Sequence, residues 1–282
     1  MLPSAPEREA DVTHPDTETY QVSIVKFGTR STIKSDVYLN YHIYDEPDAP
    51  VDMDYFFWLV RNRNRTVIVD TGFSKQGGEV RKRTFLVDPA EAFTALGVDP
   101  ASAPQVIITH AHYDHIGNLR MFPRAEIVMA RAELDFWLGP FAERAQFKHS
   151  IELEDLEYLR TAARRGNVTT FSDDLQIAPG IQIVRVGGHT PGQSIVTVET
   201  EEGQVVLASD AIHYYEEYER DTPFMFVNDV REMYNGFDTI RKLMESTGRH
   251  LVTGHDPSTL ARFNLVTTGP LAGLMATIGR KE

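Results

Sequence analysis

The hydrophobic and polar positions from residue 20 onward form short apolar runs separated by turn residues, with a few longer segments of helical spacing between them. The runs predict strands over 21–28, 55–62, 65–72, 103–110, 125–130, 181–188, 194–200, 204–211 and 250–256. Helical patterns cover 89–96, 132–138, 151–165 and 229–246. Because both halves run strands first and helices second, the pattern predicts an α/β protein, an αββα sandwich of two β-rich halves.

Residues 1–19 differ from the rest, because they are rich in Pro, Asp, Glu and Thr and hold few large apolar side chains. This composition predicts a flexible N-terminal arm over 1–19. No other stretch has the composition of a linker, so residues 20–282 are expected to form a single domain. With 41% hydrophobic residues, a chain of 282 residues can bury a substantial core.

The charge balance limits the classes of partner that can be expected, because 41 acidic against 28 basic residues give a net charge of -13. Nucleic acid and an anionic membrane surface are therefore not expected as partners, and small neutral or weakly charged substrates fit better. The N-terminus has no apolar core of a signal peptide, and the longest apolar run, 55–60, is too short to span a bilayer. We expect a soluble, cytoplasmic protein.

Cysteine is absent, which excludes disulfides, thiolate nucleophiles and cysteine-bound zinc. Any metal must then be bound by histidine and carboxylate side chains. Such side chains stand where five of the predicted strands end. These positions are Asp70, the segment His110–His115, His189, Asp210 and His255. Since α/β folds usually place their sites at strand ends, we expect the five ends to meet at one edge.

The segment THAHYDHIGN, residues 109–118, favours a site for two metals. In an extended segment His110 and His112 point the same way, so as neutral imidazoles they can share one ion. Past the strand end, Asp114 and His115 turn to a second position, as required by two-metal hydrolases, whose ions lie about 3.5–4 Å apart. Later strand ends supply His189, Asp210 and His255. These residues would complete the ligand shells of both metals if the Asp210 carboxylate bridges the two ions.

This pattern, HxHxDH followed by Gly-His, an Asp after an apolar strand and a final Gly-His, resembles the metallo-β-lactamase-fold hydrolases over most of residues 20–256. The resemblance implies an αββα sandwich of two mixed β-sheets flanked by helices. It assigns one metal to His110, His112 and His189, a second metal to Asp114, His115 and His255, and the bridge to Asp210. Asp70 matches the family's early Asp-x-Gly turn, which supports the site without binding metal.

The resemblance also limits the type of reaction and the metals that are expected. His112 favours hydrolysis over redox reactions, because the di-iron relatives that reduce oxygen or nitric oxide carry Glu at that position. Asp210 replaces the Cys of the β-lactam-degrading relatives and argues against antibiotic hydrolysis. Two divalent metal ions are implied, with Zn²⁺ as the default, although a His/Asp shell also accepts manganese, iron or cobalt.

Within that family, the segments at 187–196, 209–219 and 251–256 resemble the N-acyl homoserine lactonases, which degrade quorum-sensing signals. The expected function is a lactonase, a carboxylic ester hydrolase in which a hydroxide bridging the metals opens the lactone ring. Asp114 is expected to pass a proton to the departing alkoxide. The chain departs from the family at His213, where a tyrosine that contacts the lactone is found in those enzymes. Either His213 or the following Tyr214 is then expected to stabilise the oxyanion, or the substrate differs.

Several alternatives stay open at this point. The same fold and ligands serve hydrolases of other lactones, cyclic amides and thioesters, and a phosphodiesterase is disfavoured by the acidic balance. A non-enzymatic binding module is the alternative from another class, and it would be expected to have lost ligands. The resemblance leaves a homodimer open, in which the N-terminal arm could exchange between subunits. Apolar walls for an acyl chain are expected from 38–42, 136–138 or 224–226, and the run 55–60 is assigned to the core.

Overall fold

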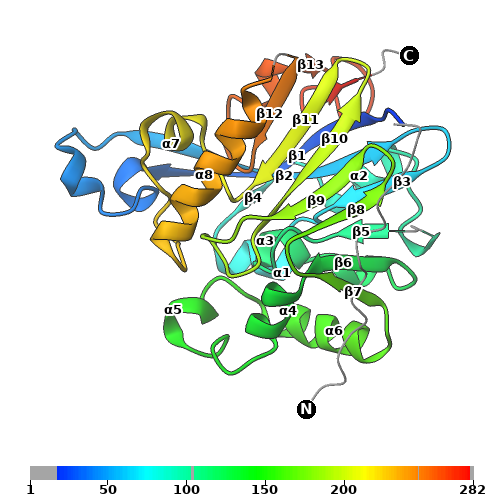
Figure 1. Cartoon of the computed structure of the whole chain (residues 1–282), viewed down its shortest axis with the longest axis horizontal. Coiled ribbons are helices and arrows are strands. Elements are labelled where there is room, and N and C mark those ends of the chain that lie inside the picture. Colours follow the sequence, from blue (N-terminus) through cyan, green and yellow to red (C-terminus); the bar gives the residue numbers. More distant parts are fainter. Residues whose placement is uncertain (1–17, 103–104, 247, 280–282) are drawn as a thin grey trace.

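The structure, a computed structural model, describes residues 18–102, 105–246 and 248–279, in which two β-sheets pack face to face (Figure 1). The first sheet has nine strands, in the order β13-β14-β1-β2-β3-β5-β6-β7 with β4 paired to β1. Its strands are β1 (Gln21–Ile33), β2 (Pro50–Arg61), β3 (Thr66–Val69), β4 (Thr84–Phe85), β5 (Gln105–Ile107), β6 (Glu126–Ala130), β7 (Val168–Phe171), β13 (Asn264–Leu265) and β14 (Met275–Ile278). The second sheet has five, in the order β12-β11-β10-β9-β8. They are β8 (Asp174–Ala178), β9 (Ile181–Arg185), β10 (Ser194–Thr200), β11 (Gly203–Ser209) and β12 (Arg249–Thr253).

Helices cover the outer face of each sheet. Those before β8 in the chain are α1 (Lys75–Val80), α2 (Pro89–Ala95), α3 (Tyr113–Ile116), α4 (Arg131–Trp137), α5 (Ala145–Lys148) and α6 (Leu153–Arg164). Those after β11 are α7 (Tyr215–Arg220) and α8 (Val230–Met244). Short 3-10 turns are η1 (Lys34–Asp36), η2 (Tyr41–Tyr44), η3 (Pro100–Ser102), η4 (Leu119–Met121) and η5 (Leu260–Arg262). Both sheets combine parallel and antiparallel pairs, so the expected αββα sandwich of two mixed sheets is confirmed.

The strand β2 shows how the layers are held together. Its alternate side chains Tyr55, Phe57 and Leu59 join the core between the first sheet and its helices. Phe56, Trp58 and Val60 face the other way and join the core between the two sheets, as successive side chains of a strand do. All of residues 55–60 are buried, which confirms their assignment to the core. A third core lies between the second sheet and α8, which contributes Met233, Phe237 and Ile240.

Most predicted elements are present within a few residues of their expected limits. The turn after β2 is closed by a hydrogen bond from the Asn62 amide to the Arg65 carbonyl, and Gly97 and Gly166 adopt positive φ just beyond α2 and α6. The prediction of a strand over 103–110 was too long, because the chain leaves the sheet after Ile107. Strands β4, β7, β8, β13 and β14 were not predicted, and β4 and β13, with two residues each, are too short to show a period.

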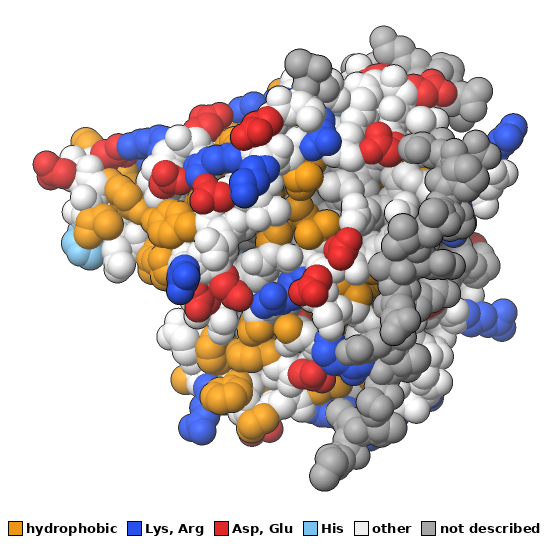
Figure 2. Space-filling view, in the orientation of Figure 1, with side chains coloured by type: hydrophobic (Ala, Val, Ile, Leu, Met, Phe, Trp, Pro, Cys, Tyr) orange, Lys and Arg blue, Asp and Glu red, His pale blue; other side chains and the backbone are white. Residues whose placement is uncertain are grey.

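The predicted N-terminal arm lies outside the described residues as far as residue 17. From Tyr20 onward the chain belongs to the fold, because the Tyr20 amide donates to the Glu199 carbonyl of the second sheet. None of the described helices is both long enough and apolar enough to cross a membrane. On the face shown in Figure 2, acidic and basic side chains are intermingled, and hydrophobic side chains gather on the projecting part at the left.

Replacing Trp58 separates two contributions to the stability of the fold, that of the side-chain volume and that of the indole N–H. Trp58 is fully buried between the sheets, and its Nε1 has no hydrogen-bond partner among the described residues. We expect Trp58→Ala to lower the free energy of unfolding by about 3–5 kcal/mol, because it leaves a large cavity. Trp58→Phe should cost less than about 2 kcal/mol, since it keeps an aromatic ring and removes an unpaired donor.

Urea unfolding of the two variants and the parent protein, followed by circular dichroism, measures both changes. Equal losses in the two variants would contradict the assignment of Trp58 as a residue that acts by filling space.

Candidate metal centre

Five strand ends converge at one edge of the sandwich, as the sequence predicted. β3 and β5 of the first sheet are followed by Asp70 and by His110, and β9, β11 and β12 of the second sheet are followed by His189, Asp210 and His255. The helix α3 begins directly after His112 and carries Asp114 and His115 in its single turn. All seven expected ligand residues are buried. Each sheet therefore supplies part of one cluster of imidazoles and carboxylates.

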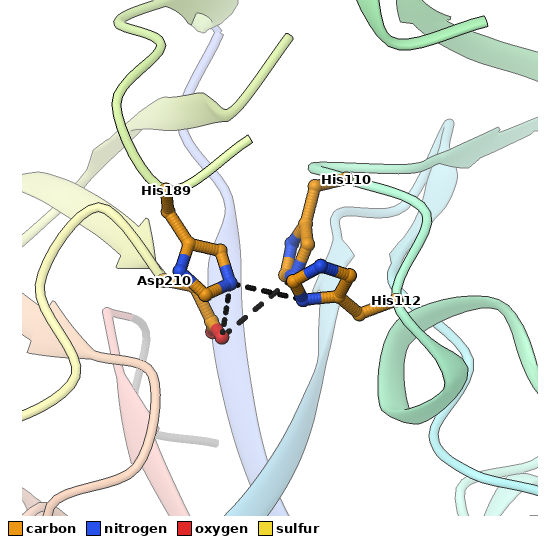
Figure 3. A group of neighbouring side chains, drawn as sticks. All are labelled: His110, His112, His189 and Asp210. Carbon is orange, nitrogen blue, oxygen red and sulfur yellow. Dashed lines mark hydrogen bonds and ion pairs between the residues drawn. The ribbon is translucent and has the colours of Figure 1, made fainter. Parts of the chain in front are cut away.

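The side chains fall into two neighbouring groups. Each residue of a group offers one ligand atom, and within a group these atoms all lie within 4.8 Å of one another. The first group consists of His110, His112, His189 and Asp210, and the second of Asp114, His115 and His255. Figure 3 shows the first group, with side chains from separate segments turned toward one point. The arrangement fits two ions with His and Asp ligands.

The Asp210 carboxylate stands between the two groups. Its Oδ2 lies 3.7 Å from His110 Nε2 and 3.4 Å from His189 Nε2, on the side of the first group. Its Oδ1 lies 3.3 Å from His115 Nε2 and 3.1 Å from His255 Nε2, on the side of the second group. Oδ1 thus faces the second group, whereas Oδ2 faces the first group and also lies 3.2 Å from His255 Nε2.

Buried atoms without partners support the presence of cations here. Among the described residues, His110 Nε2, His115 Nε2 and Asp210 Oδ1 are buried and make no hydrogen bond. Buried polar atoms in native proteins are nearly always paired, so atoms that converge unpaired point to an ion. The donor set of imidazole and carboxylate suits divalent metals such as zinc.

The protonation states of the first group suit the same role, whereas in the second group Asp210, Asp70 and Asp114 raise the pKa of His115 well above its ordinary value against the effect of burial. Burial lowers the pKa of His110 and His112 well below the ordinary value and that of His189 to about 3, so these imidazoles are neutral. Burial alone would raise the pKa of Asp210, but the surrounding imidazoles, first among them His255, hold it well below its usual range. Neutral imidazole and ionised carboxylate are the forms that bind metal.

Backing hydrogen bonds fix three of the rings with Nε2 directed into the cluster. Asp70 Oδ2 lies 2.8 Å from His115 Nδ1 and also accepts from the Thr109 hydroxyl, which fits the supporting role expected for Asp70. His189 Nδ1 lies 2.6 Å from the Phe226 carbonyl, and His255 Nδ1 lies 2.7 Å from the Asp54 carbonyl. Partners of this kind orient metal-binding histidines and select their tautomer.

Glu133, which was not predicted from the sequence as a residue of the site, is fully buried under the cluster. Its Oε1 accepts from the Ala111 amide at 2.8 Å and from Trp137 Nε1 at 2.6 Å. Its Oε2 accepts from the Thr190 hydroxyl at 2.7 Å and from the Gly192 amide at 2.8 Å. The carboxylate therefore ties the His110–His112 segment to the loop of His189. Its position in the first turn of α4 looks like that of any solvated acidic residue, so no local signal reveals it.

His213 contacts Asp210 rather than open space. Its Nε2 lies 3.2 Å from Asp210 Oδ2, and its Nδ1 lies 3.2 Å from Glu217 Oε2. These two carboxylates raise the pKa of His213 to about 9 although burial opposes them. One face of the ring stacks on Phe224, with 3.7 Å between ring centroids. The hydroxyl of Tyr214 points elsewhere and donates to the Asp52 carbonyl at 3.2 Å.

A cavity of about 270 Å³ opens onto the cluster. Its lining includes the ligand candidates Asp114, Asp210, His112, His189 and His255. Of the three segments expected to wall an acyl chain, only 224–226 contributes, through Phe224 and Phe226, whereas 38–42 and 136–138 do not line it. His213 and Tyr214 do not line it either. The remaining lining residues are Arg30, Met53, Tyr55, Arg81, Arg83, Tyr113, His149 and Ser150.

Known proteins share both the sequence pattern and the fold. Residues 54–257 match the family model of the metallo-beta-lactamase superfamily. An N-acyl homoserine lactonase of Bacillus cereus is 30% identical over 194 residues, which cover 63% of this chain and 72% of that relative. An N-acyl homoserine lactonase of Bacillus thuringiensis is 24% identical over 225 residues, covering 74% of this chain and 84% of the relative.

Solved structures show a similar fold. A quorum-quenching N-acyl homoserine lactone lactonase superposes with a TM-score of 0.72 at 19% identity, covering 86% of this chain and 95% of that one. A dizinc quorum-quenching lactonase in complex with a product superposes with a TM-score of 0.69 at 18% identity, covering 95% of this chain and 96% of that one. With the family match spanning the cluster and most of the sandwich, the chain belongs to the metallo-beta-lactamase superfamily.

Proposed function

We propose that this chain is a two-metal hydrolase that opens a lactone ring, with N-acyl homoserine lactones as the first substrate class to test. The observation that carries the proposal is the cluster itself, in which two groups of ligand atoms share Asp210 and face one cavity. The names of the relatives support the substrate class. A hydrolase of another lactone, a cyclic amide or a thioester is the second candidate, because the same ligands serve all three. A binding module without activity is disfavoured, since none of the seven expected ligand residues is missing from the sequence.

In this proposal His110, His112 and His189 would hold one divalent cation, Asp114, His115 and His255 would hold the other, and Asp210 would be shared between them. Zn²⁺ is the proposed metal. When bound, such a pair of cations polarises an ester carbonyl and lowers the pKa of water, which makes a nucleophile available at neutral pH.

The protein's own side chains then have three tasks. Asp114 lines the cavity and is 7% exposed, so we assign its carboxylate the transfer of a proton, which it takes from the attacking water and gives to the alcohol oxygen that leaves when the ring opens. Glu133 positions the segments of His112 and His189 relative to each other. Phe224 and Phe226 provide apolar surface for the part of the substrate that does not react.

His213 and Tyr214 stay predictions as donors to the oxyanion. The contacts of His213 favour a positioning role, since it holds Asp210 from one side and is held by Glu217 from the other. Tyr214 would have to release the Asp52 carbonyl before its hydroxyl reached the cavity. A cytoplasmic location and a homodimer likewise stay predictions from the sequence.

Hydrolysis of homoserine lactones with short and long acyl chains tests the proposed function directly. We expect acid release, followed with a pH indicator in weak buffer, to stop after chelation and to return when zinc is restored. A protein that holds two metal equivalents yet leaves every lactone intact would exclude the lactonase and leave the other hydrolases of this fold.

Asp210→Asn tests the bridging role. We expect this variant to lose at least one of two metal equivalents, because an amide is a weaker ligand than a carboxylate between two cations. Its activity should fall by more than the roughly 10–100-fold typical for loss of a residue that merely backs a ligand. Asp238→Asn, at an exposed position of α8, is the control and should keep both metal and activity. Full metal content in Asp210→Asn, measured by mass spectrometry of the metals, contradicts the assignment.

Glu133→Gln tests the positioning role. The amide nitrogen of Gln cannot accept the N–H donors that one carboxylate oxygen accepts now. If it takes the place of Oε1, the bond from the Ala111 amide, which ties the His110–His112 segment to Glu133, is lost together with the bond from Trp137 within α4. We expect metal affinity, measured by competition with a chelator, to fall about 10–100-fold. Glu143→Gln changes an exposed glutamate and should leave the affinity unchanged. A Glu133→Gln protein that is less stable but binds metal as before would reduce Glu133 to a structural residue.

A further inference from the structure

One wall of the cavity is basic, in a protein whose net charge is -13. This arginine wall consists of Arg30, Tyr55, Arg83 and Tyr113. Arg30 lies on β1 opposite Met53 of β2, two positions along from the pair of Gly28 and Tyr55. The Arg83 guanidinium lies 5.7 Å from the centre of the Tyr55 ring, and its Nε donates to the Tyr113 hydroxyl at 3.0 Å. The four side chains are thus neighbours.

The two guanidinium groups of this wall lack a carboxylate partner. Within the described part of the chain, no acidic side chain forms an ion pair with Arg30 or Arg83, and Arg30 Nε is buried without a hydrogen bond. Arg81, which also lines the cavity, is different because it pairs with Glu152 and donates to the Ile151 carbonyl. A partly buried cation without a counter-ion is costly, which favours an anion brought by the ligand.

The charge of Asp114 acts on Arg83, but no ion pair joins these two described residues, and the contacts of both cavity carboxylates lie in the cluster. Asp210 is surrounded by imidazoles, and the Asp114 carboxylate lies 3.8 Å from both His115 Nε2 and His255 Nε2. Both carboxylates are proposed metal ligands, so their charge is directed to the cluster.

The hydroxyl of Tyr113 holds Arg83 in this wall, because its oxygen accepts from Arg83 Nε at 3.0 Å. Arg83 is fixed from the other side by a bond from Nη1 to the Arg81 carbonyl at 2.8 Å. The wall therefore presents oriented donors and positive charge, the combination that binds a carboxylate.

We propose that the substrate of this site is an anionic lactone, whose carboxylate, borne away from the reacting ester, binds to Arg30 and Arg83. The proposal rests on the proposed function and deepens it by naming the substrate class. A neutral lactone would bring no counter-charge to these guanidinium groups, and a site built from polar donors discriminates strongly against a ligand that lacks the matching acceptor.

Matched substrates test this inference. N-succinyl and N-glutaryl homoserine lactone carry a terminal carboxylate, and their methyl esters have nearly the same shape without the charge. We expect kcat/KM to be at least about tenfold higher for each acid than for its ester. Arg30→Gln and Arg83→Gln should remove this preference, because they lower kcat/KM much more for the acid than for its ester, and Arg30→Lys should keep part of it. Arg164→Gln, at an exposed position of α6, is the control and should keep the preference in full.

A binding measurement separates this inference from the lactonase proposal. The analogues in which a CH₂ group replaces the ring oxygen have no ester to open, and calorimetry gives their affinity directly. Tighter binding of the acid than of its methyl ester, lost in Arg30→Gln and Arg83→Gln, supports the anion site even if no lactone is hydrolysed. Equal affinities, or equal losses for acid and ester in the variants, overturn the anion site even if neutral lactones are hydrolysed rapidly.

Discussion

The position of the Asp210 carboxylate between two groups of imidazoles is the constraint on which the rest of the site depends. Its oxygens face His110 and His189 on one side and His115 and His255 on the other. The first sheet carries part of these ligands and the second sheet the rest, so the cluster exists only while the sheets are packed. Hydrogen bonds at the edge hold that packing, among them the one from the Ser194 amide to the Thr109 carbonyl.

The local backbone is adapted to this carboxylate. Ser209, directly before Asp210, has a φ of 47°, and the pairing of β11 with β12 shifts register there. A side chain at Gly254 would bring a Cβ to within 2.8 Å of Asp210 Oδ1 and 2.7 Å of the Ser209 carbonyl. Only glycine allows the segment of His255 to approach so closely, which is a physical reason for the Gly-His pair.

The ligand positions could be predicted from the sequence because each follows an apolar run and the pattern HxHxDH is local. The contributions of Glu133, Arg30 and Arg83 could not, since each depends on contacts between segments far apart in the chain. The two arginines of the cavity show most clearly why such contributions could not be predicted. The net charge of -13 favoured neutral or weakly charged substrates, but a sum over the chain carries no information about two arginines that meet in one cavity. The stacking of His213 on Phe224 is a further feature that depends on tertiary packing and could not be predicted from the sequence.

The site thus combines a cluster of imidazoles and carboxylates with a cavity wall that contains arginines, in keeping with the rule that one fold serves many substrates through the residues around its site. The central claim is that two metals are held on either side of Asp210. Anomalous diffraction from a crystal grown with zinc tests it most directly. The account predicts two peaks, one beside His110 and His189 and one beside His115 and His255. The absence of peaks at Asp210, or a single peak away from it, would contradict the account.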